Sequence, residues 1–593
     1  MTTARGHIQH SPRMSLAPYP VQPVTDDIVR TAELHPGKIA MIDGVTGAEH
    51  TYAEIVTASK RLGRHLQDVG VGVGDRVAIV ATNSPEWAVV FLGTLFAGGT
   101  VTTLNPLYTP REIGEQFADS EPKVVFAIEA TMDNVRAVWG DAPHAHLTAE
   151  VWELAGAAAG EALPVEFDPT TQIAVLPYSS GTTGAPKGVE LTHGNFLFDA
   201  SSAVTALGAI FEVPDASTVL FLPLAHVFAR DIQVACVMAS IRVTHCPDVK
   251  DLPSELKRAK PSFVLAVPRF FEKIYNGAQQ RANDEGKGKI FATAAQTAIE
   301  YSEALEAGRV STGLRLRHGS LDRLVYRRLR DALGGNVHWA ISGGAALGPR
   351  LGHFFRGIGV TVLEGYGLTE TTAAATVNTP THQRVGSVGR PLPGTEVAVS
   401  DDGEVWVRGP HVMRGYWPDG KTGGATGAVD IDAGGWLRTG DLGQLDDDGF
   451  LTITGRLKEI LVTSSGKNVA PGVLEDRLKA HPLISQALVV GDGRPYVAAL
   501  VTLDPDALPH WCEQRGRAAT PPAELVDDPE LLDTVQQAVT EANRAVSRAE
   551  AIKRFIVLPV DLTEGGGHLT PTLKVRRSQV AAEFADSIEA LYT

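Results

Sequence analysis

The sequence predicts an α/β protein with a large N-terminal domain of layered sheets, a small β subdomain and a smaller α+β C-terminal domain. Apolar runs typical of buried strands alternate with helical patterns from about residue 24 to 380. Short strands and turns replace that alternation over 386–455, and a separate set of strands and helices follows Gly455. Alternating strand and helix patterns are typical of largely parallel sheets covered by helices.

Length and composition set the class of protein. A chain of 593 residues with a hydrophobic fraction of 44% is long and apolar enough for two or more globular domains. A net charge of −16 argues against nonspecific binding to nucleic acid or to anionic membrane, because both require a basic face. The 3 cysteines are too few and too scattered for a disulfide framework or a zinc site.

No segment of the sequence is typical of export or of a membrane span. The first residues, MTTARGHIQHSPRM, contain no apolar core of a signal peptide. The most apolar stretch, Trp87–Val101, is shorter than the ~20 residues that a transmembrane helix needs. We therefore expect a cytoplasmic protein without a transmembrane segment.

The domain boundaries follow from changes in the pattern. We expect a flexible tail over 1–23, an N-terminal domain over 24–455 with its β subdomain over about 386–455, a hinge at 456–458 and a mobile C-terminal domain over 459–593. The predicted helices of the N-terminal domain are 52–69, 85–98 and several within 270–333, and its predicted strands are 77–80, 124–128, 173–178, 218–222, 263–267, 338–341 and 360–363. The C-terminal domain is predicted to have strands at 484–490 and 496–503 and helices at 471–480 and 529–548.

The most informative segment follows the predicted strand 173–178. It places hydroxyls, glycines and one lysine together, namely Ser179, Ser180, Gly181, Thr182, Thr183, Gly184 and Lys187. Exposed N–H groups and hydroxyls of such a loop can surround phosphate oxygens, and the lysine adds positive charge. Proline precedes the lysine and glycine follows it, so the loop is not a Walker A motif, which ends in Gly-Lys-Ser/Thr. A nucleotide remains the expected ligand.

A second candidate turn follows the predicted strand 360–363. Its residues are Glu364, Gly365, Tyr366, Gly367, Leu368, Thr369 and Glu370. Thr369 can bond a phosphate oxygen, and Glu370 can hold Mg²⁺, which takes oxygen ligands that it shares with phosphates. The alternative is an ordinary helix start, with Thr369 as the cap and an acidic first turn.

Two further glycine-containing turns complete the pattern. Gly343, Gly344 and Ala345 follow a predicted strand and would let a flat base or an acyl group lie against the backbone. Asp441 lies in a glycine-flanked turn and can accept two hydrogen bonds from a ribose, which Arg456 could also reach. The first could equally be a tight strand-to-helix turn, and Asp441 and Arg456 could simply lie in surface turns.

In their order along the chain, these motifs resemble those of the adenylate-forming superfamily, which includes acyl-CoA synthetases, coumarate-CoA ligases, luciferases and adenylation domains. The resemblance covers roughly residues 30–590. Residues 30–130 are more similar to coumarate-CoA ligases, whereas 220–370 and the C-terminal domain are more similar to bacterial long-chain fatty acyl-CoA synthetases.

The resemblance implies roles for individual residues. Lys574, in Pro571-Thr572-Leu573-Lys574, matches the adenylation lysine, Lys458 the hinge, and Gly466 and Lys467 the loop that closes on the pantetheine arm of CoA. Asp441 and Arg456 match the residues that grip the ribose, and 343–345 line the adenine and acyl pockets. His226 matches an aromatic gate of the carboxylate pocket, although a lone His on an apolar stretch is commonly a core residue.

The implied activity is a two-step ligation. ATP and Mg²⁺ would activate a hydrophobic carboxylic acid to an acyl-AMP, and CoA would then accept the acyl group. Three alternatives remain. The enzyme could stop at the acyl-AMP and pass it to a partner ligase or carrier protein, it could be a luciferase-like oxygenase, or it could be a degenerate binding protein that keeps the fold.

Overall fold

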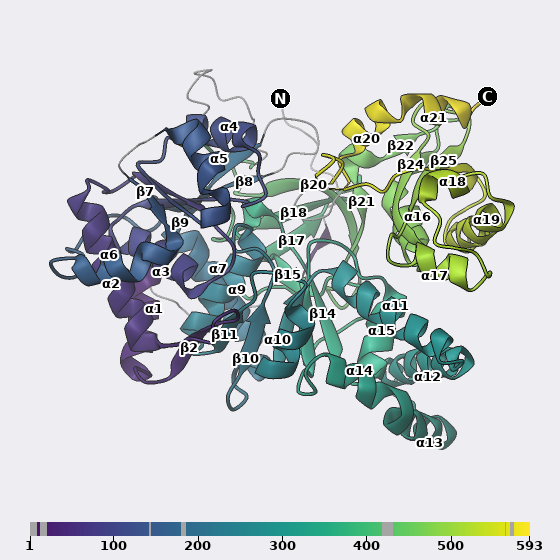
Figure 1. The fold of residues 1–593 in the computed structure, drawn as a ribbon, viewed down its shortest axis with the longest axis horizontal. Helices are drawn as coiled ribbons and strands as arrows, with labels where there is room; N and C mark the ends of the chain where they lie inside the picture. The colour runs from purple at the N-terminus through teal and green to yellow at the C-terminus, as the bar shows by residue number, and fades with distance from the viewer. Residues whose placement is uncertain are drawn as a thin grey trace.

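The computed structural model of the chain describes residues 9–11, 21–140, 144–179, 186–417, 431–563, 565–569 and 575–593. Within these residues the predicted α/β class is confirmed. Figure 1 shows a large body that contains the N-terminal sheets and, at its right, a smaller green-to-yellow body formed by the C-terminal residues.

The first sheet of the N-terminal domain carries the segment that is rich in Ser, Thr and Gly. Its seven strands, in hydrogen-bonded order, are β19 (Gly415–Tyr416), β9 (Lys187–Thr192), β8 (Ile173–Ser179), β5 (Thr100–Leu104), β4 (Arg76–Val80), β6 (Val124–Ala127) and β7 (Ala145–Leu147). The strands from β8 to β7 are parallel, whereas β9 turns back antiparallel to β8 and β19 is antiparallel to β9. The segment that follows Ser179 therefore connects two antiparallel neighbouring strands.

Two smaller sheets complete this domain. One is parallel through β10 (Ser217–Leu220), β11 (Arg242–His245) and β2 (Ile39–Asp43) and ends in antiparallel β3 (Glu49–Thr51). The other runs β12 (Phe263–Ala266), β13 (Trp339–Ser342), β14 (Thr361–Tyr366), β15 (Thr376–Val377) and β16 (Arg390–Pro391), with the first three strands parallel. Both β13 and β14 lead directly into predicted site residues.

Helices cover these sheets, as the alternating pattern predicts. They are α1 (Val24–Leu34), α2 (Tyr52–Asp68), α3 (Pro85–Phe96), α4 (Pro110–Ser120), α5 (Glu129–Trp139), α6 (Val151–Ala157), α7 (His193–Ala206), α8 (Gly208–Phe211), α9 (Val227–Met238), α10 (Leu252–Ala259) and α15 (Pro349–Gly357). Helix α3 contains most of the longest apolar stretch and is buried over 87–95. Across the parts of the chain that are described, every helix falls short of the length and apolarity that a membrane crossing requires.

The charged region 270–333 is helical, as predicted. It forms α11 (Pro268–Asp284), α12 (Gly288–Glu306), α13 (Thr312–Leu321), a π-helical turn over Asp322–Tyr326 and α14 (Arg327–Ala332). Helix α12 packs so closely on α15 that a Cβ on Gly357 would lie 2.0 Å from the carbonyl oxygen of Ala298. Figure 1 shows α12 and α13 projecting at the lower right.

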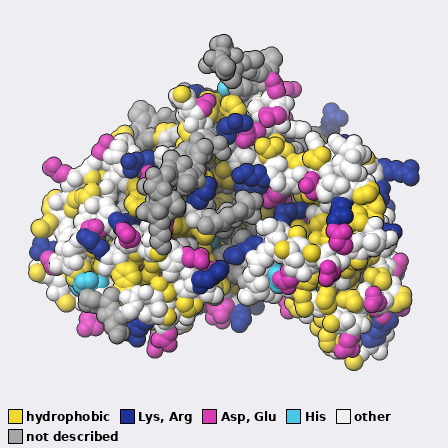
Figure 2. Space-filling model, turned by 90° about the horizontal axis from the view of Figure 1, so that it is seen from above, with side chains coloured by type: hydrophobic (Ala, Val, Ile, Leu, Met, Phe, Trp, Pro, Cys, Tyr) yellow, Lys and Arg dark blue, Asp and Glu magenta, His cyan; other side chains and the backbone are white. Residues whose placement is uncertain are grey.

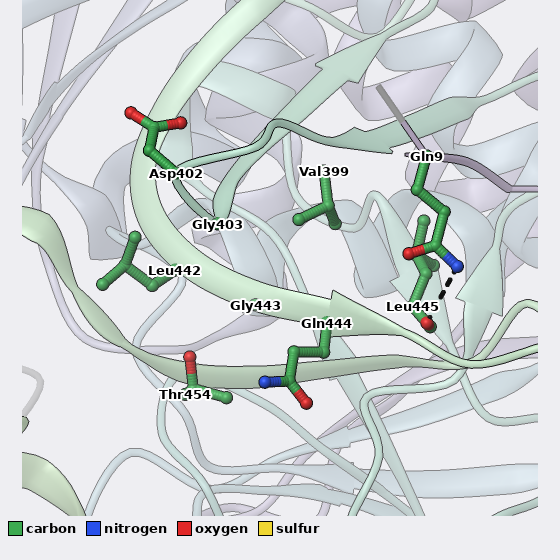
Figure 3. Close-up of a pocket in the computed structure, with 9 residues that line it drawn as sticks. All are labelled: Gln9, Val399, Asp402, Gly403, Leu442, Gly443, Gln444, Leu445 and Thr454. Carbon is green, nitrogen blue, oxygen red and sulfur yellow. Dashed lines mark hydrogen bonds between the residues drawn. The ribbon is translucent and has the colours of Figure 1, made fainter. Parts of the chain in front are cut away.

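The β subdomain is a five-stranded sheet that includes part of the N-terminal segment. Its order is β1 (Gln9–His10), β17 (Glu396–Val399), β18 (Glu404–Arg408), β20 (Leu437–Leu445) and β21 (Leu451–Arg456). The loose tail expected over 1–23 is therefore wrong at Gln9 and His10, which pair antiparallel with β17. Gln9 also donates a hydrogen bond to the carbonyl of Leu445 and lines a cavity of about 410 Å³ (Figure 3).

The C-terminal domain has its own apolar core. Its sheet is β24 (Ile484–Val490), β25 (Val497–Leu503) and β26 (Ile552–Val557), and its helices are α16 (Pro471–Lys479), α17 (Leu508–Glu513), α18 (Pro522–Leu525), α19 (Pro529–Asn543), α20 (Arg577–Glu583) and α21 (Ala585–Ala590). The two predicted strands and the helix at 471–480 agree with the structure, whereas the helix predicted over 529–548 ends at Asn543.

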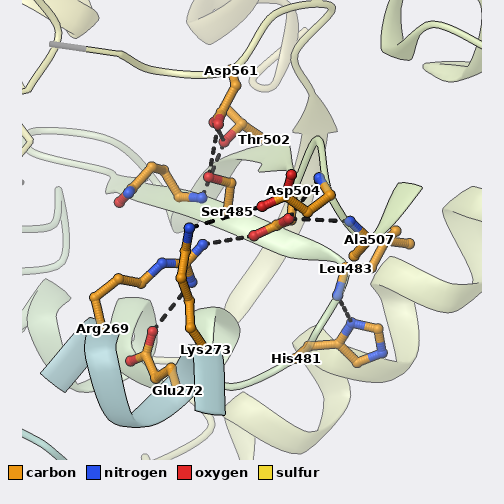
Figure 4. A network of polar contacts seen from close by, with 12 residues as sticks. Arg269, Glu272, Lys273, His481, Leu483, Ser485, Thr502, Asp504, Ala507 and Asp561 are labelled. Atoms are coloured by element: carbon orange, nitrogen blue, oxygen red, sulfur yellow. Dashed lines mark hydrogen bonds and ion pairs between the residues drawn. The ribbon is translucent and has the colours of Figure 1, made fainter. Parts of the chain in front are cut away.

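Charged side chains join the two domains along α11. Arg269 Nη2 lies 2.7 Å from Asp504 Oδ2, as Figure 4 shows. Lys273 Nζ lies 3.8 Å from Asp506 Oδ2 and, near the end of the helix, Asp284 lies 2.7 Å from His510 Nε2. The contacts fix which face of the C-terminal domain lies on the N-terminal domain in this conformation.

Candidate active site

The phosphate-binding candidate is the hairpin between β8 and β9. Ser179 and Lys187 face each other across the two strands, and Ser179 Oγ lies 3.5 Å from the carbonyl oxygen of Lys187. Five other predicted residues of this loop lie outside the described residues, namely Ser180, Gly181, Thr182, Thr183 and Gly184. The described ends place both the start of the loop and its lysine at one edge of the sheet.

Close packing holds the lysine end of the hairpin. A Cβ on Gly188 would lie 2.9 Å from Cβ of Trp417, so the strand tolerates only glycine without a shift. The amide of Trp417 donates to the carbonyl of Gly188, and β19 pairs Tyr416 with Val189. Segment 413–417 is therefore fixed against β9.

Tyr416 lies between the two charged residues that the sequence assigns to phosphate and metal. Lys187 Nζ lies 4.9 Å from the centre of the Tyr416 ring, and the Tyr416 hydroxyl donates a 2.9 Å hydrogen bond to Glu370 Oε1. The amide of Met413 donates to the carbonyl of Glu370 as well. The fold thus brings Lys187 and Glu370, which are far apart in sequence, to one place.

The turn that carries Glu370 is tightly constrained. A Cβ on Gly367 would lie 1.6 Å from the carbonyl oxygen of Ala373, so this position requires glycine. Thr369 begins a 3-10 turn over Thr369–Thr371. Thr372 follows it at φ 63° and ψ −52°, a backbone conformation that non-glycine residues adopt at a cost, and its hydroxyl donates to the carbonyl of His411. Strain of this kind is typical of functional turns.

The predicted ribose residues lie together. Asp441 and Arg456 are register partners on β20 and β21, and Arg456 Nε donates a 3.0 Å hydrogen bond to Asp441 Oδ1. The Tyr366 hydroxyl donates to the other carboxylate oxygen at 2.7 Å. Burial and then the Asp441 charge raise the pKa of Tyr366, so its phenol stays protonated. The three residues form one hydrogen-bonded cluster.

The glycine turn after β13 is held by a buried carboxyl group. Gly343 is buried, whereas Gly344 and Ala345 face solvent. Glu364 Oε2 accepts a 2.9 Å hydrogen bond from the amide of Leu347, just beyond this turn. Burial raises the pKa of Glu364 to about 7, and the Leu347 amide opposes the shift. Glu364, which the sequence predicts to bind the nucleotide, thus contacts this turn from its buried side.

Residues from α9 and from the end of β12 lie against this turn, which the resemblance assigns to the adenine and acyl pockets. A Cβ on Gly343 would lie 3.1 Å from the ring of Phe228, and one on Gly344 would lie 3.9 Å from Val267. His226 immediately precedes α9, and its Nε2 has no hydrogen-bond partner among the described residues. Burial, and then the charge of Arg230, lower the pKa of His226 to about 4, so the imidazole is neutral at pH 7.

The predicted hinge and CoA loop lie between β21 and α16. Lys458 is exposed within a 3-10 turn over Leu457–Glu459. Gly466 has φ +78°, with open space around a Cβ. Lys467 Nζ lies 3.1 Å from Glu550 Oε1, so its charge is paired within the C-terminal domain in this conformation. The structure does not bring Gly466 or Lys467 into contact with the two clusters described above.

Lys574 lies outside the described residues, but its flanks are described. Leu569 and Val575 form an antiparallel bridge. Arg576 Nη2 lies 4.0 Å from Glu112 of α4, across the domain boundary. The same helix holds the phosphate hairpin, because the Tyr178 hydroxyl donates a 2.6 Å hydrogen bond to Asp119.

Seen from above, Lys and Arg side chains cluster between the two lobes of the molecule (Figure 2). The residues that the structure describes include no group of three His, Cys, Asp or Glu that could hold a metal ion. A single carboxylate such as Glu370 nevertheless fits Mg²⁺ that takes most of its ligands from phosphates and water.

Sequence reasoning missed Tyr416. Its only local signal is the run Gly415-Tyr416-Trp417, in which two aromatic residues follow a glycine. Its contacts with Lys187 and Glu370 arise only from the pairing of β19 with β9.

Comparison with protein families agrees with this arrangement. The sequence matches the AMP-binding enzyme family over residues 28–417 and the AMP-binding enzyme C-terminal domain over residues 458–593. The long-chain-fatty-acid–CoA ligase FadD15 of Mycobacterium tuberculosis is 44% identical over 93% of this chain and 93% of its own length. The long-chain-fatty-acid–CoA ligase ACSBG1 of Homo sapiens is 31% identical over 92% of this chain and 81% of its own.

Solved structures share the fold at lower identity. The o-succinylbenzoate CoA synthetase of Bacillus subtilis, in complex with its acyl-adenylate intermediate, has a TM-score of 0.68 at 23% identity and covers 94% of this chain and 98% of its own. An anthranilate CoA ligase, AuaEII, in complex with anthranoyl-AMP has a TM-score of 0.72 at 19% identity, with 95% and 98% covered. A fatty acyl CoA synthetase of Mycobacterium tuberculosis has a TM-score of 0.62 at 22% identity, with 95% and 99% covered.

Proposed function

Because the chain belongs to the AMP-binding enzyme family, we propose that it is an AMP-forming acyl-CoA ligase whose substrate is a long-chain fatty acid. In the first step a carboxylate oxygen of the acid attacks the α-phosphorus of ATP, and the bond to the bridging oxygen breaks to release pyrophosphate. In the second step the thiolate of CoA attacks the acyl carbonyl, and AMP leaves. Chemistry of this kind depends on positioning and on neutralising negative charge.

One observation carries this proposal. The short segment 366–370 contacts the Asp441–Arg456 cluster at its start, through Tyr366, and the Tyr416–Lys187 cluster at its end, through Glu370. A nucleoside triphosphate likewise carries its phosphates on one side of the ribose, with the base on the other. The spacing of the two clusters along one turn supports a nucleotide that lies along this segment.

At the phosphate end, Lys187 would bind the outgoing pyrophosphate and Thr369 would donate to a phosphate oxygen. Glu370 would hold Mg²⁺, which supplies positive charge that screens the phosphates when it is bound. The hairpin loop from Ser179 to Gly184 would surround the phosphates with N–H and hydroxyl donors.

At the ribose end, the carboxylate of Asp441 would accept hydrogen bonds from the two sugar hydroxyls. Arg456 and Tyr366 would hold that carboxylate in place, because both donate to it in this structure. Gly343, Gly344 and Ala345 would lie against the adenine, and Glu364 would fix that turn from behind through the Leu347 amide.

The apolar contacts near Gly343 support a hydrophobic acid. Phe228 packs on Gly343 and Val267 lies near Gly344, so the acyl group would extend between α9, the end of β12 and this turn. The neutral His226 would border the carboxylate end, where an imidazolium would otherwise pair with the substrate carboxylate. Two relatives named as long-chain-fatty-acid–CoA ligases support the chain-length class.

The decisive experiment measures both half-reactions on a series of acids. ATP–pyrophosphate exchange reports acyl-AMP formation, and mass spectrometry reports acyl-CoA. We expect both signals with saturated acids of long chain, and weak signals with short-chain and aromatic acids. Exchange without any thioester would replace this proposal with an acyl-AMP ligase that serves a partner or carrier protein, and absence of ATP binding would leave only a non-catalytic protein.

The proposed role of Lys574 has its own test. Lys574→Ala should reduce pyrophosphate exchange by about 10²- to 10³-fold, because the carboxylate and the α-phosphate would approach without a neutralising charge. The same variant should convert supplied acyl-AMP and CoA to acyl-CoA at nearly the wild-type rate. Lys553→Ala, a lysine on β26 that binds the carbonyl of Arg548, is the matched control and should change neither half-reaction. Equal loss of both half-reactions would contradict the role.

A further inference from the structure

We propose that Tyr416 is a positioning residue that keeps Lys187 and Glu370 apart, so that both charges remain available to Mg²⁺ and ATP. The proposal rests on the proposed function, because that function gives the lysine and the carboxylate their roles. Tyr416 itself would touch neither the reacting carboxylate nor the α-phosphorus.

The geometry places one neutral side chain between two opposite charges. The Tyr416 ring faces the Lys187 ammonium at 4.9 Å, and its hydroxyl donates to Glu370 at 2.9 Å. Among the residues that the structure describes, Lys187 and Glu370 form no ion pair with each other. The phenol instead gives each of them a favourable contact.

The backbone leaves Tyr416 little freedom to move away. Residues 413–417 are hydrogen-bonded to both neighbours at once, since Met413 binds the carbonyl of Glu370 and Trp417 binds the carbonyl of Gly188. The register of β19 on β9 then sets Tyr416 opposite Val189. Segment 413–417 therefore links strand β9, which carries Lys187, to the turn that carries Glu370.

The physical consequence concerns charge. A lysine and a glutamate that met directly would attract each other, and a bound metal or phosphate would have to separate them first. A cation–π contact and a phenol hydrogen bond transfer no proton and neutralise neither charge. They can therefore orient the two side chains while leaving the ammonium positive and the carboxylate negative. Tyr416 thus preserves a negative site for Mg²⁺ beside a positive site for phosphate.

Two substitutions separate the hydroxyl from the ring. Tyr416→Phe keeps the ring beneath Lys187 and removes the hydrogen bond to Glu370. Tyr416→Leu removes both contacts and leaves room for Lys187 to approach Glu370. The matched control is Tyr326→Phe, which removes a 2.8 Å hydrogen bond from a buried phenol to the carbonyl of Ala294, in the helical region 288–332.

The readout is ATP affinity by calorimetry, with excess Mg²⁺ and with EDTA, on the full-length protein without acid or CoA. Tyr416→Phe should weaken Mg·ATP binding by about 5- to 10-fold and change metal-free ATP binding by less than about 2-fold, because only the carboxylate loses a partner. Tyr416→Leu should weaken both. Tyr326→Phe should lower Tm and leave the ratio of the two affinities unchanged.

A double variant tests whether Tyr416 acts by keeping Lys187 and Glu370 apart. In the Tyr416→Leu protein, adding Lys187→Gln should improve the half-saturating Mg²⁺ concentration for ATP binding, because it frees Glu370 from the lysine. In the wild-type background the same lysine substitution should not improve it. Strictly additive effects, or Tyr416→Phe behaving like Tyr326→Phe, would overturn the proposal. Wild-type protein that binds no ATP would instead refute the proposed function itself.

Discussion

The contacts that build the nucleotide cluster differ in kind from those that join the two domains. The Asp441 side chain is 9% exposed and that of Arg456 34% exposed, and their strands are paired in register. At the domain boundary the Lys273 and Asp506 side chains are 65% and 84% exposed and their charges are 3.8 Å apart. The Arg269 and Asp504 side chains at the same boundary are only 21% and 13% exposed. The nucleotide cluster is therefore part of one sheet, whereas the boundary pairs range from exposed to half-buried and join separate domains.

This difference fits the two-step reaction proposed for the protein. A partly buried, hydrogen-bonded pair is costly to break, because each partner would be left without its counter-charge. Exposed ion pairs contribute about 0–1 kcal/mol each and weaken further with salt. The N-terminal cluster can therefore persist while the C-terminal domain changes its contacts between the two half-reactions.

The largest effect is expected inside the nucleotide cluster. Asp441→Ala should lower kcat/KM for ATP by about 10²- to 10³-fold, because the ribose loses its acceptor and two donors, Arg456 and Tyr366, lose their partner. Pyrophosphate exchange at varied ATP measures it. Asp402→Ala, on the turn before β18, is the control and should stay within about 2-fold. Similar losses in both variants would mean that Asp441 acts only through general stability.

A second prediction uses the buried Glu364. Its pKa is about 7 in the folded protein, against an ordinary 4.5, so between these values the native state binds more protons than the unfolded state. The free energy of unfolding must then fall as pH rises from about 4.5 to 7, by roughly 3 kcal/mol from this group. Glu364→Gln cannot ionise and should lack that part of the fall.

The measurement is Tm of both proteins from pH 5 to pH 8. We expect the Tm of Glu364→Gln, relative to that of the wild type, to rise steadily with pH and to level off above about pH 7. Glu33→Gln, an exposed carboxylate on α1, should follow the wild-type profile. Parallel curves for wild type and Glu364→Gln would show that the Glu364 carboxyl group ionises at its ordinary pKa in the folded protein.

Much of the fold and of the site composition could be predicted from local patterns. The apolar run 173–178 predicts β8, and the pattern over 85–98 predicts α3, because these signals lie within one element. The motifs also indicated the adenylate-forming superfamily, which the family match confirms. The roles of individual residues, including Lys574, remain predictions.

Contacts between distant segments could not be predicted in the same way. Gln9 and His10 look like a loose tail because their strand exists only when β17 supplies its partner. The position of Tyr416 depends on a strand of two residues that pairs across more than two hundred residues of chain. The pattern of a single sequence does not show which distant segments pair. The contacts of Tyr416 with Lys187 and Glu370 therefore could not be predicted.

The smallest effect is expected at the domain boundary. Arg269→Gln removes the 2.7 Å pair with Asp504, whose side chains are 21% and 13% exposed, so Tm should fall. The fall should be modest, because two backbone amides still donate to Asp504 and the contacts through Lys273 and His510 remain. The ratio of the two half-reactions should nevertheless shift by about 2- to 5-fold at low salt, because this conformation loses a contact that another arrangement of the domains need not contain. Adding Asp504→Asn to Arg269→Gln should cause little further shift, since the pair is already broken, and about 0.5 M salt should reduce the difference from the wild type. If the ratio stays constant in every variant and at every salt concentration, the charged contacts along α11 are not part of the equilibrium between the two steps.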